Sequence, residues 1–243
     1  MAKKRTSKGW FHYDRKYLYL GMKQIDKKIA LDNLKLFQTL LGSVGIEIFP
    51  AYGTLLGIVR DNDFITWDED IDLYMLKEDE TKLNDLLYTL KDNEFELIRY
   101  ERSGLYSFMR HGEYIDIYVL EDVGSGIRNN AGDLFFDEDF KEVIGYDFKG
   151  LTLKIPKNHT RHLEFLYGDW QTPLQYTDYK LNPLQKFKMK LQVFIKYSLP
   201  DKLYFSLLRK HHRNNYEKFF QKCEDRNIEI DKNQILKRLD ILR

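Results

Sequence analysis

Apolar residues recur at helical spacing in the N-terminal part of the chain, from Tyr13 to Leu41, with polar residues between them. The apolar positions are Leu18, Ile25, Ile29, Leu34, Phe37 and Leu41. This pattern predicts one long helix or two short ones, ending near Gly42 and Gly45.

Runs of apolar residues predict both strands and helices in the rest of the chain. The expected strands are 46–52, 71–76, 95–99, 105–110, 113–120 and 151–155, and the expected helices are 54–60, 80–93 and 160–167. Residues 121–150 are rich in glycine, asparagine and acids, which favours a loop with some hairpin. From Asn182 onward the pattern is helical and is broken near Pro200.

This order of elements predicts an α+β fold, with a mixed sheet core, flanking helices and a helical C-terminal region. We expect three parts. Residues 1–45 form an N-terminal helical segment packed on the core, residues 46–181 form the core, and residues 182–243 form a basic helical region.

Composition narrows the class of protein. The 243 residues are 43% hydrophobic and 15% aromatic, which predicts a globular fold. The net charge of +1 neither supports nor excludes any partner. The single Cys223 excludes a disulfide framework within the chain, and no Cys/His cluster has zinc spacing. No apolar run has signal-peptide or membrane-span length, so we expect a cytoplasmic protein, soluble or peripheral.

Two aspartates, Asp70 and Asp72, lie two positions apart at the start of a predicted strand. Residues at this spacing point to the same face, so the two carboxylates lie side by side with Ile71 buried behind them. Their repulsion raises a pKa unless a cation compensates. Carboxylate oxygens suit Mg²⁺ or Mn²⁺, which takes further ligands from a substrate phosphate. The pair therefore predicts a metal site for phosphoryl transfer.

Other residues nearby fit the same chemistry. Gly53 and Thr54 lie between a predicted strand and a predicted helix, where backbone N–H groups can approach a phosphate. Arg60 can add a bidentate phosphate contact. Asp116, at the centre of an apolar strand, can complete the metal site or act as a general base on an acceptor hydroxyl.

Each feature also has a structural interpretation. Aspartates two apart are common on solvated strand edges, and Gly-Thr after a strand is often just a turn. Asp116 can cap or pair with Arg110, and Arg60 can pair with Asp61 or Asp63. The combination of these features in this order favours the functional interpretation.

The segment Gly53-Thr-Leu-Leu-Gly57, then Arg60, then Ile65-Thr-Trp-Asp-Glu-Asp-Ile-Asp72, resembles the signature of the LicD/fukutin family. The resemblance is most specific over residues 46–76 and extends to about residue 120. Tyr167-Gly-Asp-Trp170 also resembles a C-terminal motif of bacterial members. Thr66 stands where the family usually has proline, and the zinc-binding insertion of the animal relatives has no counterpart, so we expect no zinc.

The resemblance implies a nucleotidyltransferase-like catalytic core in which Asp70 and Asp72 hold the metal and Asp116 is the third carboxylate of the catalytic set. The substrate- and phosphate-binding residues that it implies are Gly53, Thr54, Gly57, Arg60, Trp67 and Asp68. It also implies a CDP-activated alcohol, such as CDP-choline, as donor. The hydroxyl of a cell-surface glycan or a lipid-linked glycan precursor would be the acceptor, as in polysaccharide biosynthesis, and phosphorylcholine is one of several possible head groups.

Three other functions stay open. A nucleotidyltransferase of the same fold would transfer a nucleotide and release pyrophosphate. A glycosyltransferase with an Asp-x-Asp pair would use a nucleotide sugar, although it leaves Gly53 and Asp116 unexplained. A non-catalytic nucleotide-binding module has no need of the intact acids.

Residues 183–220 carry nine lysines and arginines against two acids, interleaved with apolar residues. One interpretation is an amphipathic surface for peripheral contact with an anionic membrane. The other is a pair of helices packed on the core with a solvated lysine face. We expect no nucleic-acid partner.

Overall fold

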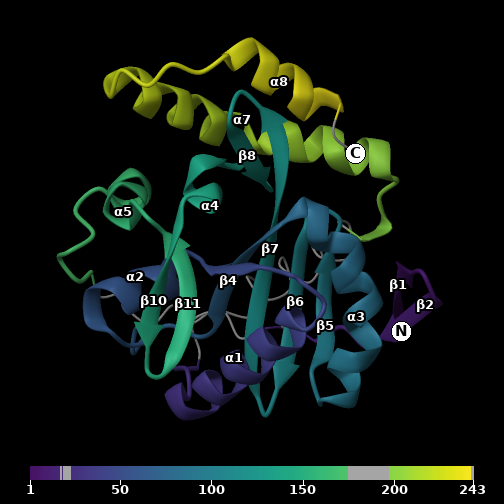
Figure 1. The fold of residues 1–243 in the computed structure, drawn as a ribbon. Coiled ribbons are helices and arrows are strands. Elements are labelled where there is room, and N and C mark those ends of the chain that lie inside the picture. Colours follow the sequence, from purple (N-terminus) through teal and green to yellow (C-terminus); the bar gives the residue numbers. More distant parts are fainter. Residues whose placement is uncertain (17, 19–22, 175–196, 242–243) are drawn as a thin grey trace. The chain divides into compact units, whose positions relative to one another are not determined.

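A computed structural model describes residues 1–16, 18, 23–174 and 197–241 (Figure 1). The chain divides into two compact units, each described here by itself. The first contains residues 1–121 and 138–176, and the second contains residues 122–137 and 177–243. The sequence-based boundaries after residues 45 and 181 stay predictions.

The first unit opens with a β-hairpin, in which β1 (Ala2–Thr6) pairs with β2 (Gly9–Tyr13). The prediction of a helical N-terminal segment beginning at Tyr13 is therefore wrong at this point. Phe11 and Tyr13 are buried while His12 between them is exposed, which is the two-residue period of a strand. Residues 17 and 19–22 of the predicted helix lie outside the described residues.

Helix α1 (Lys27–Gly42) begins where a capping side chain stands. The Asp26 carboxylate accepts hydrogen bonds from the N–H groups of Lys28 and Ile29, each at 3.1 Å. These bonds satisfy two of the donors that the first helical turn leaves unpaired, so Asp26 fixes the start of the helix.

A mixed sheet with the strand order β3-β4-β7-β6-β5 forms the centre of the first unit. Its strands are β3 (Ile48–Pro50), β4 (Ile71–Leu76), β5 (Glu96–Glu101), β6 (Leu105–Arg110) and β7 (Glu113–Gly124). β4 and β7 are parallel, and the other neighbours are antiparallel. The predicted strands 71–76, 105–110 and 113–120 are confirmed. Of the strand expected at 46–52, only residues 48–50 form a strand, which is β3.

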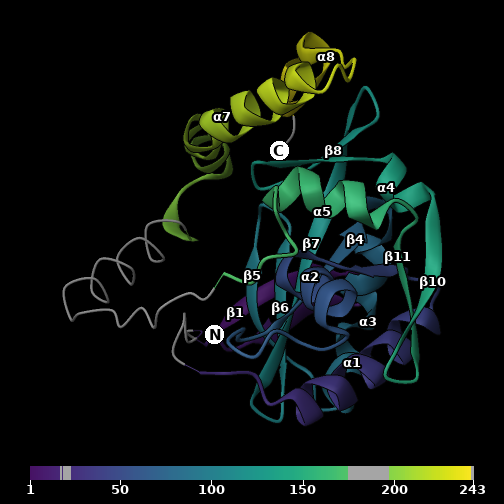
Figure 2. The same ribbon diagram turned by 90° about the vertical axis from the view of Figure 1, so that its left-hand side faces the viewer.

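One face of this sheet carries the main hydrophobic core. Side chains such as Leu73 on β4 and Ile117 on β7 pack with Leu34 and Phe37 of α1 and Leu87 of α3 (Glu80–Asp92). The two helices lie against the same face (Figures 1 and 2). Because side chains alternate along a strand, the even-numbered residues of β4 and β7 point to the other face.

The segment 121–150, expected to be mostly loop, contains regular structure. β7 continues to Gly124, and β8 (Ile127–Asn130), β9 (Asp133–Phe136), α4 (Glu138–Lys141) and β10 (Val143–Phe148) follow. The loop prediction is wrong for these elements, while the expectation of some hairpin is confirmed by β8–β9. Gly126 and Gly132 have positive φ angles of 70° and 106°, so the glycines mark tight turns between short strands rather than a long loop.

β11 and α5 of the first unit follow the sequence pattern. β10 pairs with β11 (Leu151–Pro156), and α5 (His159–Tyr167) ends at Gly168 with a φ of 71°. Helix α2 (Tyr52–Asp61) starts two residues earlier than predicted, and Tyr52 has a positive φ of 40°. A positive φ is uncommon for a non-glycine side chain, so this turn is a strained position.

The second unit contains β8, β9, α7 (Asp201–Asp225) and α8 (Lys232–Ile241). The predicted break near Pro200 is confirmed, because α7 begins directly after it. Residues 183–196 of the basic segment lie outside the described residues. Among the helices that the structure describes, none is long and apolar enough to span a bilayer.

Candidate active site

The carboxylates of Asp70, Asp72 and Asp116 meet on the face of the sheet opposite the main core. Parallel pairing places Asp72 and Asp116 directly opposite each other, with Ile71 opposite Ile115 on the core side. One carboxylate oxygen from each aspartate lies within 4.8 Å of the others. The structure therefore brings together the three acids that the sequence singled out.

Burial makes this cluster electrostatically unfavourable without a compensating cation. Burial raises the pKa of all three carboxyls, and repulsion from Asp116 raises the pKa values of Asp70 and Asp72 further. A hydrogen bond from the Tyr118 hydroxyl to Asp72 acts in the opposite direction and lowers the pKa of Asp72.

Two carboxylate oxygens of the cluster are left without partners. In the part of the chain that the structure describes, Asp72 Oδ1 and Asp116 Oδ1 are buried and accept no hydrogen bond. Buried polar atoms are normally satisfied, so two such oxygens beside each other need an explanation. A divalent cation that prefers oxygen ligands, Mg²⁺ or Mn²⁺, fits this donor set.

A row of polar side chains continues from the cluster across the sheet. Asp116 is opposite Ser107 on β6, and Ser107 is opposite Arg99 on β5. Arg99 Nη2 donates to Asp116 Oδ2, and Arg99 Nε donates to Ser107 Oγ at 2.8 Å. Asp116 is 2% exposed, so Arg99 compensates a buried charge and opposes the effect of burial on its pKa.

The start of α2 is attached to β4 beside the cluster. The N–H of Asp72 donates to Thr54 Oγ1, and the N–H of Ala51 donates to the carbonyl of Asp72, both at 2.9 Å. Thr54 is thus a buried structural link between the helix and the strand that carries Asp72, rather than an exposed hydroxyl.

Gly53 lies against Asp68. A Cβ atom at Gly53 would come within 2.3 Å of Asp68 Oδ2, so glycine allows the carboxylate to approach the first turn of α2. Burial raises the pKa of Asp68 to about 6. Asp68 also contributes to the raised pKa values of Asp70 and Asp72 by repulsion, so it belongs to the electrostatic surroundings of the cluster.

Two of the predicted phosphate-binding residues, Gly57 and Arg60, make contacts within the fold. A Cβ atom at Gly57 would lie 2.6 Å from the carbonyl oxygen of Asp63, so Gly57 permits a close backbone approach. Arg60 forms two hydrogen bonds with Asp61, from Nε at 2.9 Å and from Nη2 at 2.8 Å. The half-buried Trp67 lies in the turn before Asp68.

Sequence reasoning missed Arg99, Ser107 and Tyr118. The available signal was a polar residue inside a predicted strand, the same signal that singled out Asp116. Tyr118 shares the face of Asp116, two residues further along β7, and its ring centroid lies 5.0 Å from that of Tyr52. Arg99 and Tyr118 thus place a guanidinium and a phenol hydroxyl beside the carboxylates.

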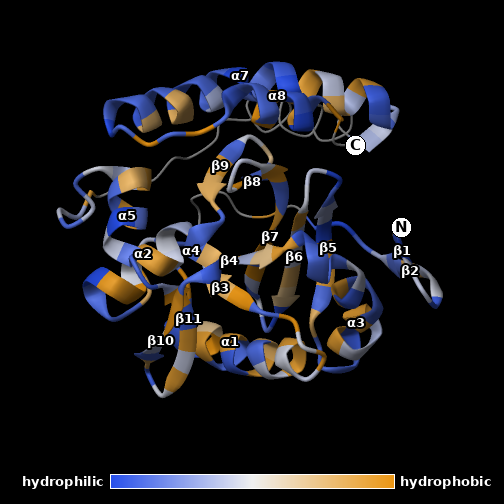
Figure 3. Ribbon diagram, turned by 45° about the horizontal axis from the view of Figure 1, so that its top comes forward, coloured by the Kyte–Doolittle hydropathy of each residue, from blue (hydrophilic) through white to orange (hydrophobic). Residues whose placement is uncertain are grey.

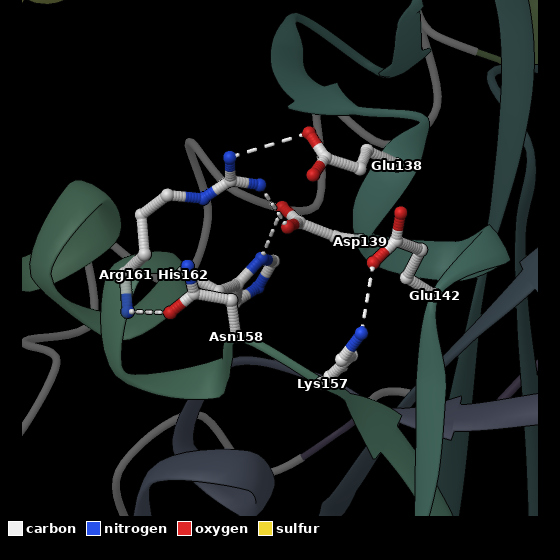
Figure 4. Close-up of polar contacts among 7 residues, drawn as sticks. All are labelled: Glu138, Asp139, Glu142, Lys157, Asn158, Arg161 and His162. Atoms are coloured by element: carbon white, nitrogen blue, oxygen red, sulfur yellow. Dashed lines mark hydrogen bonds and ion pairs between the residues drawn. The ribbon is translucent and has the colours of Figure 1, made fainter.

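A buried polar network holds α4 and α5 together in the same unit (Figure 4). Asp139 accepts hydrogen bonds from His162 Nδ1 at 2.8 Å and from Arg161 Nη2 at 2.6 Å. The His162 ring meets Tyr74 edge to face, with centroids 6.4 Å apart, and Tyr74 follows Asp72 on the same face of β4. The network thus supports the strand that carries the carboxylates.

Comparison with known proteins identifies the class. Residues 45–164 match the model of a family described as LicD/FKTN/FKRP, nucleotidyltransferase domain. The fold is that of a nucleotidyltransferase domain, as the sequence predicted. By this match residues 45–164 form a domain of the LicD family. Membership of this family supports the assignment of the protein as a transferase.

An uncharacterized protein of Rickettsia typhi is 27% identical over 158 residues, which cover 60% of this chain and 49% of that protein. The chain thus spans about half the length of the curated relative that it matches. Among solved structures, the lincomycin-bound lincosamide adenylyltransferase LnuA has a TM-score of 0.42 and 13% identity, covering 69% of this chain and 96% of LnuA. The antibiotic-resistance factor ANT(2'')-Ia has a TM-score of 0.44 and 10% identity, covering 82% and 99%. With both scores below 0.5, the fold assignment depends on the family match.

Proposed function

We propose that this protein transfers a phospho-alcohol group from a CDP-activated alcohol to a hydroxyl of a cell-surface glycan or glycolipid precursor, in the cytoplasm at the inner membrane face. The observation that carries the proposal is the convergence of Asp70, Asp72 and Asp116, with two buried oxygens that lack partners. Membership of the LicD family supports the choice of donor.

Asp70, Asp72 and Asp116 would hold Mg²⁺ or Mn²⁺. When bound, the cation neutralises phosphate charge and orients the reacting oxygens, which is most of what phosphoryl transfer requires. All other roles fall to side chains and backbone groups of the chain.

Asp116 acts in this proposal as an ionised carboxylate rather than as the general base. One of its oxygens is engaged by Arg99, and the guanidinium stabilises the charged form. A base must instead accept the acceptor's proton, so the structural role of Arg99 favours the ligand interpretation of Asp116 over the alternative that the sequence left open.

The backbone at the start of α2 positions the donor phosphates. Gly53 lies in the first turn of this helix, where N–H groups have no intrahelical partner and the helix dipole favours an anion. Thr54 fixes the helix beside Asp72 through its bond to the Asp72 N–H. A phosphate bound there would lie next to the carboxylate cluster.

In the reaction, the acceptor hydroxyl oxygen forms a bond to the phosphorus that carries the alcohol. The bond between that phosphorus and the oxygen shared with CMP breaks, and CMP leaves with the electron pair. The acceptor hydroxyl loses its proton to solvent. The products are CMP and a phosphodiester.

Product analysis tests this proposal. The protein is incubated with a panel of CDP-alcohols, nucleoside triphosphates and nucleotide sugars, each with Mg²⁺ and with a chelator, and released nucleotide is measured. We expect metal-dependent release of CMP from one CDP-alcohol, loss of release in Asp72→Asn, and normal release in Asp32→Asn, an exposed acid of α1. Release of pyrophosphate would favour a nucleotidyltransferase, and release of a nucleoside diphosphate would favour a glycosyltransferase.

A further inference from the structure

Helix α7 of the second unit has an exposed face that combines cations with leucines. Leu203 and Leu207 are 48% and 49% exposed, and they lie four residues apart, which places them on one face of the helix. Lys210, three residues after Leu207, and Lys218, eight residues further on, continue this face and are also exposed. Figure 3 shows α7 as mostly hydrophilic with hydrophobic residues at intervals.

These leucines are not the residues that pack α7 within its unit. The buried side chains of the helix are Tyr204, Tyr216, Phe219, Phe220 and Cys223. Phe219 packs against Phe136 of β9, with ring centroids 5.5 Å apart. The packing of α7 is thus achieved by a different face, and the two leucines are left in solvent.

The charge of the exposed face has one sign. Between Asp201 and Glu217 the helix contains no acidic residue. Lys202, Lys210 and Arg213 are exposed within this stretch, and none of them has an ion pair among the described residues. Arg209 in the same stretch pairs with Asp240 of α8 at 3.6 Å. The positive charge that α7 leaves uncompensated among the described residues is therefore that of Lys202, Lys210 and Arg213.

We propose that this face, defined by Lys202, Leu203, Leu207, Lys210 and Arg213, binds the surface of a membrane that contains anionic lipids. Lysines and arginines are attracted to anionic headgroups, and the leucines can enter the boundary between headgroups and acyl chains. Charge complementarity alone would also fit a nucleic acid. The paired leucines favour lipid, because a phosphodiester backbone has no apolar layer to receive them.

The contact is interfacial, since no described helix has the length and apolarity to cross a bilayer. It assigns a surface to the membrane location that the proposed function includes, and it does not depend on the transferase activity itself. The chain as a whole has a net charge of only +1, so the attraction comes from the local arrangement on α7 rather than from overall charge.

Flotation of the full chain with lipid vesicles tests this inference. Vesicles of phosphatidylcholine with phosphatidylglycerol are compared with vesicles of phosphatidylcholine alone, at low salt. We expect binding to the anionic vesicles only. Lys202→Gln/Lys210→Gln should weaken binding about fivefold for each charge removed, and Leu203→Gln/Leu207→Gln should weaken it on the order of tenfold.

Lys28→Gln/Lys91→Gln is the matched control, because it removes two exposed lysines from α1 and α3. It should bind vesicles like the unaltered chain, and all variants should keep the same circular dichroism. Failure of the unaltered chain to bind anionic vesicles, or equal weakening by the control, would overturn the inference. Binding to single-stranded RNA without vesicle binding, unaffected by the leucine changes, would replace the membrane with a nucleic acid.

Discussion

Asp72 and Asp116 are direct register partners on adjacent parallel strands, and each has one buried carboxylate oxygen without a hydrogen-bond partner. Sheet pairing therefore holds two acidic side chains together on one face. The two buried carboxylates repel each other, so this arrangement lowers the stability of the folded chain. Functional sites commonly carry such a loss of stability.

Asp72→Asn should make the metal-free protein more stable. Removing one acid relieves repulsion in the buried cluster, and we expect the free energy of unfolding to rise by about 1 kcal/mol. Urea unfolding in the presence of a chelator measures this change. An Asp72→Asn variant less stable than the unaltered protein under these conditions would show that the carboxylate has a structural role instead.

Arg99→Gln should destabilise the fold, because it leaves Asp116 buried without its cation. We expect a loss of about 3 kcal/mol in the free energy of unfolding. Lys154→Gln is the control, since Lys154 pairs with Glu47 at the surface and its loss should cost less than about 1 kcal/mol.

The double variant Arg99→Gln/Asp116→Asn measures the interaction between the two side chains apart from the contacts that each makes with other residues. If Asp116 is the reason for the loss, the double variant should recover much of the stability, and the double-mutant cycle should give a coupling energy of at least about 1 kcal/mol. Additive losses would mean that Arg99 and Asp116 stabilise the fold independently.

Gly57→Ala should destabilise the protein by about 2 to 3 kcal/mol. The new Cβ atom would meet the carbonyl oxygen of Asp63 at 2.6 Å, and backbone cannot move aside easily. Gly42→Ala, at a position with no atom within 4 Å, should leave stability unchanged or raise it slightly. Similar thermal unfolding of the two variants would contradict this account of Gly57.

Gly53→Ala should lower turnover more than stability. Its Cβ atom would displace the Asp68 side chain, which can rotate, so the fold should survive while the surroundings of the carboxylate cluster change. We expect the rate of donor cleavage to fall at least about tenfold, with less than about 1 kcal/mol lost in unfolding. Unaltered turnover would remove Gly53 from the proposed site.

Glu80 should stabilise the fold at neutral pH and not in acid. Burial alone would raise the pKa of Glu80, but hydrogen bonds with Lys77 and Tyr106 and the charge of Lys4 lower it below the usual 4.5. The folded-state pKa is therefore depressed, so the stabilisation is present above pH 4.5 and is lost as pH falls through the folded-state value.

Glu80→Gln tests this dependence. The variant should be less stable than the unaltered protein at pH 7, by about 1 to 2 kcal/mol, and the gap should narrow as the pH falls below about 4.5. Chemical unfolding at several pH values measures it. A gap that stays constant or widens in acid would contradict the sign of the shift.

The sequence predicted the centre of this molecule better than its edges. Asp70 and Asp72 could be identified because they lie two positions apart where a single strand begins. Their meeting with Asp116 depends on parallel pairing across 44 positions of sequence, which the family resemblance suggested and local pattern could not.

The failures have physical reasons. The N-terminal hairpin was missed because Tyr13 and Ile25 also fit a helical period, whereas the Asp26 cap that starts α1 is a local signal that was available. Arg99 and Ser107 reach Asp116 through strand register, so the polar residue inside a predicted strand that each of them presents does not by itself show which residue it will meet.

Binding of Mn²⁺ tests the central claim most directly, because it requires no knowledge of the donor or the acceptor. Titration of the full chain, followed by the electron paramagnetic resonance signal of free Mn²⁺, should show binding that Mg²⁺ competes away. Asp70→Asn and Asp72→Asn should each lose it, while Asp32→Asn should keep it. Equal binding in all four proteins, or none in the unaltered protein with CDP-choline or CMP present, would contradict a metal site at Asp70, Asp72 and Asp116.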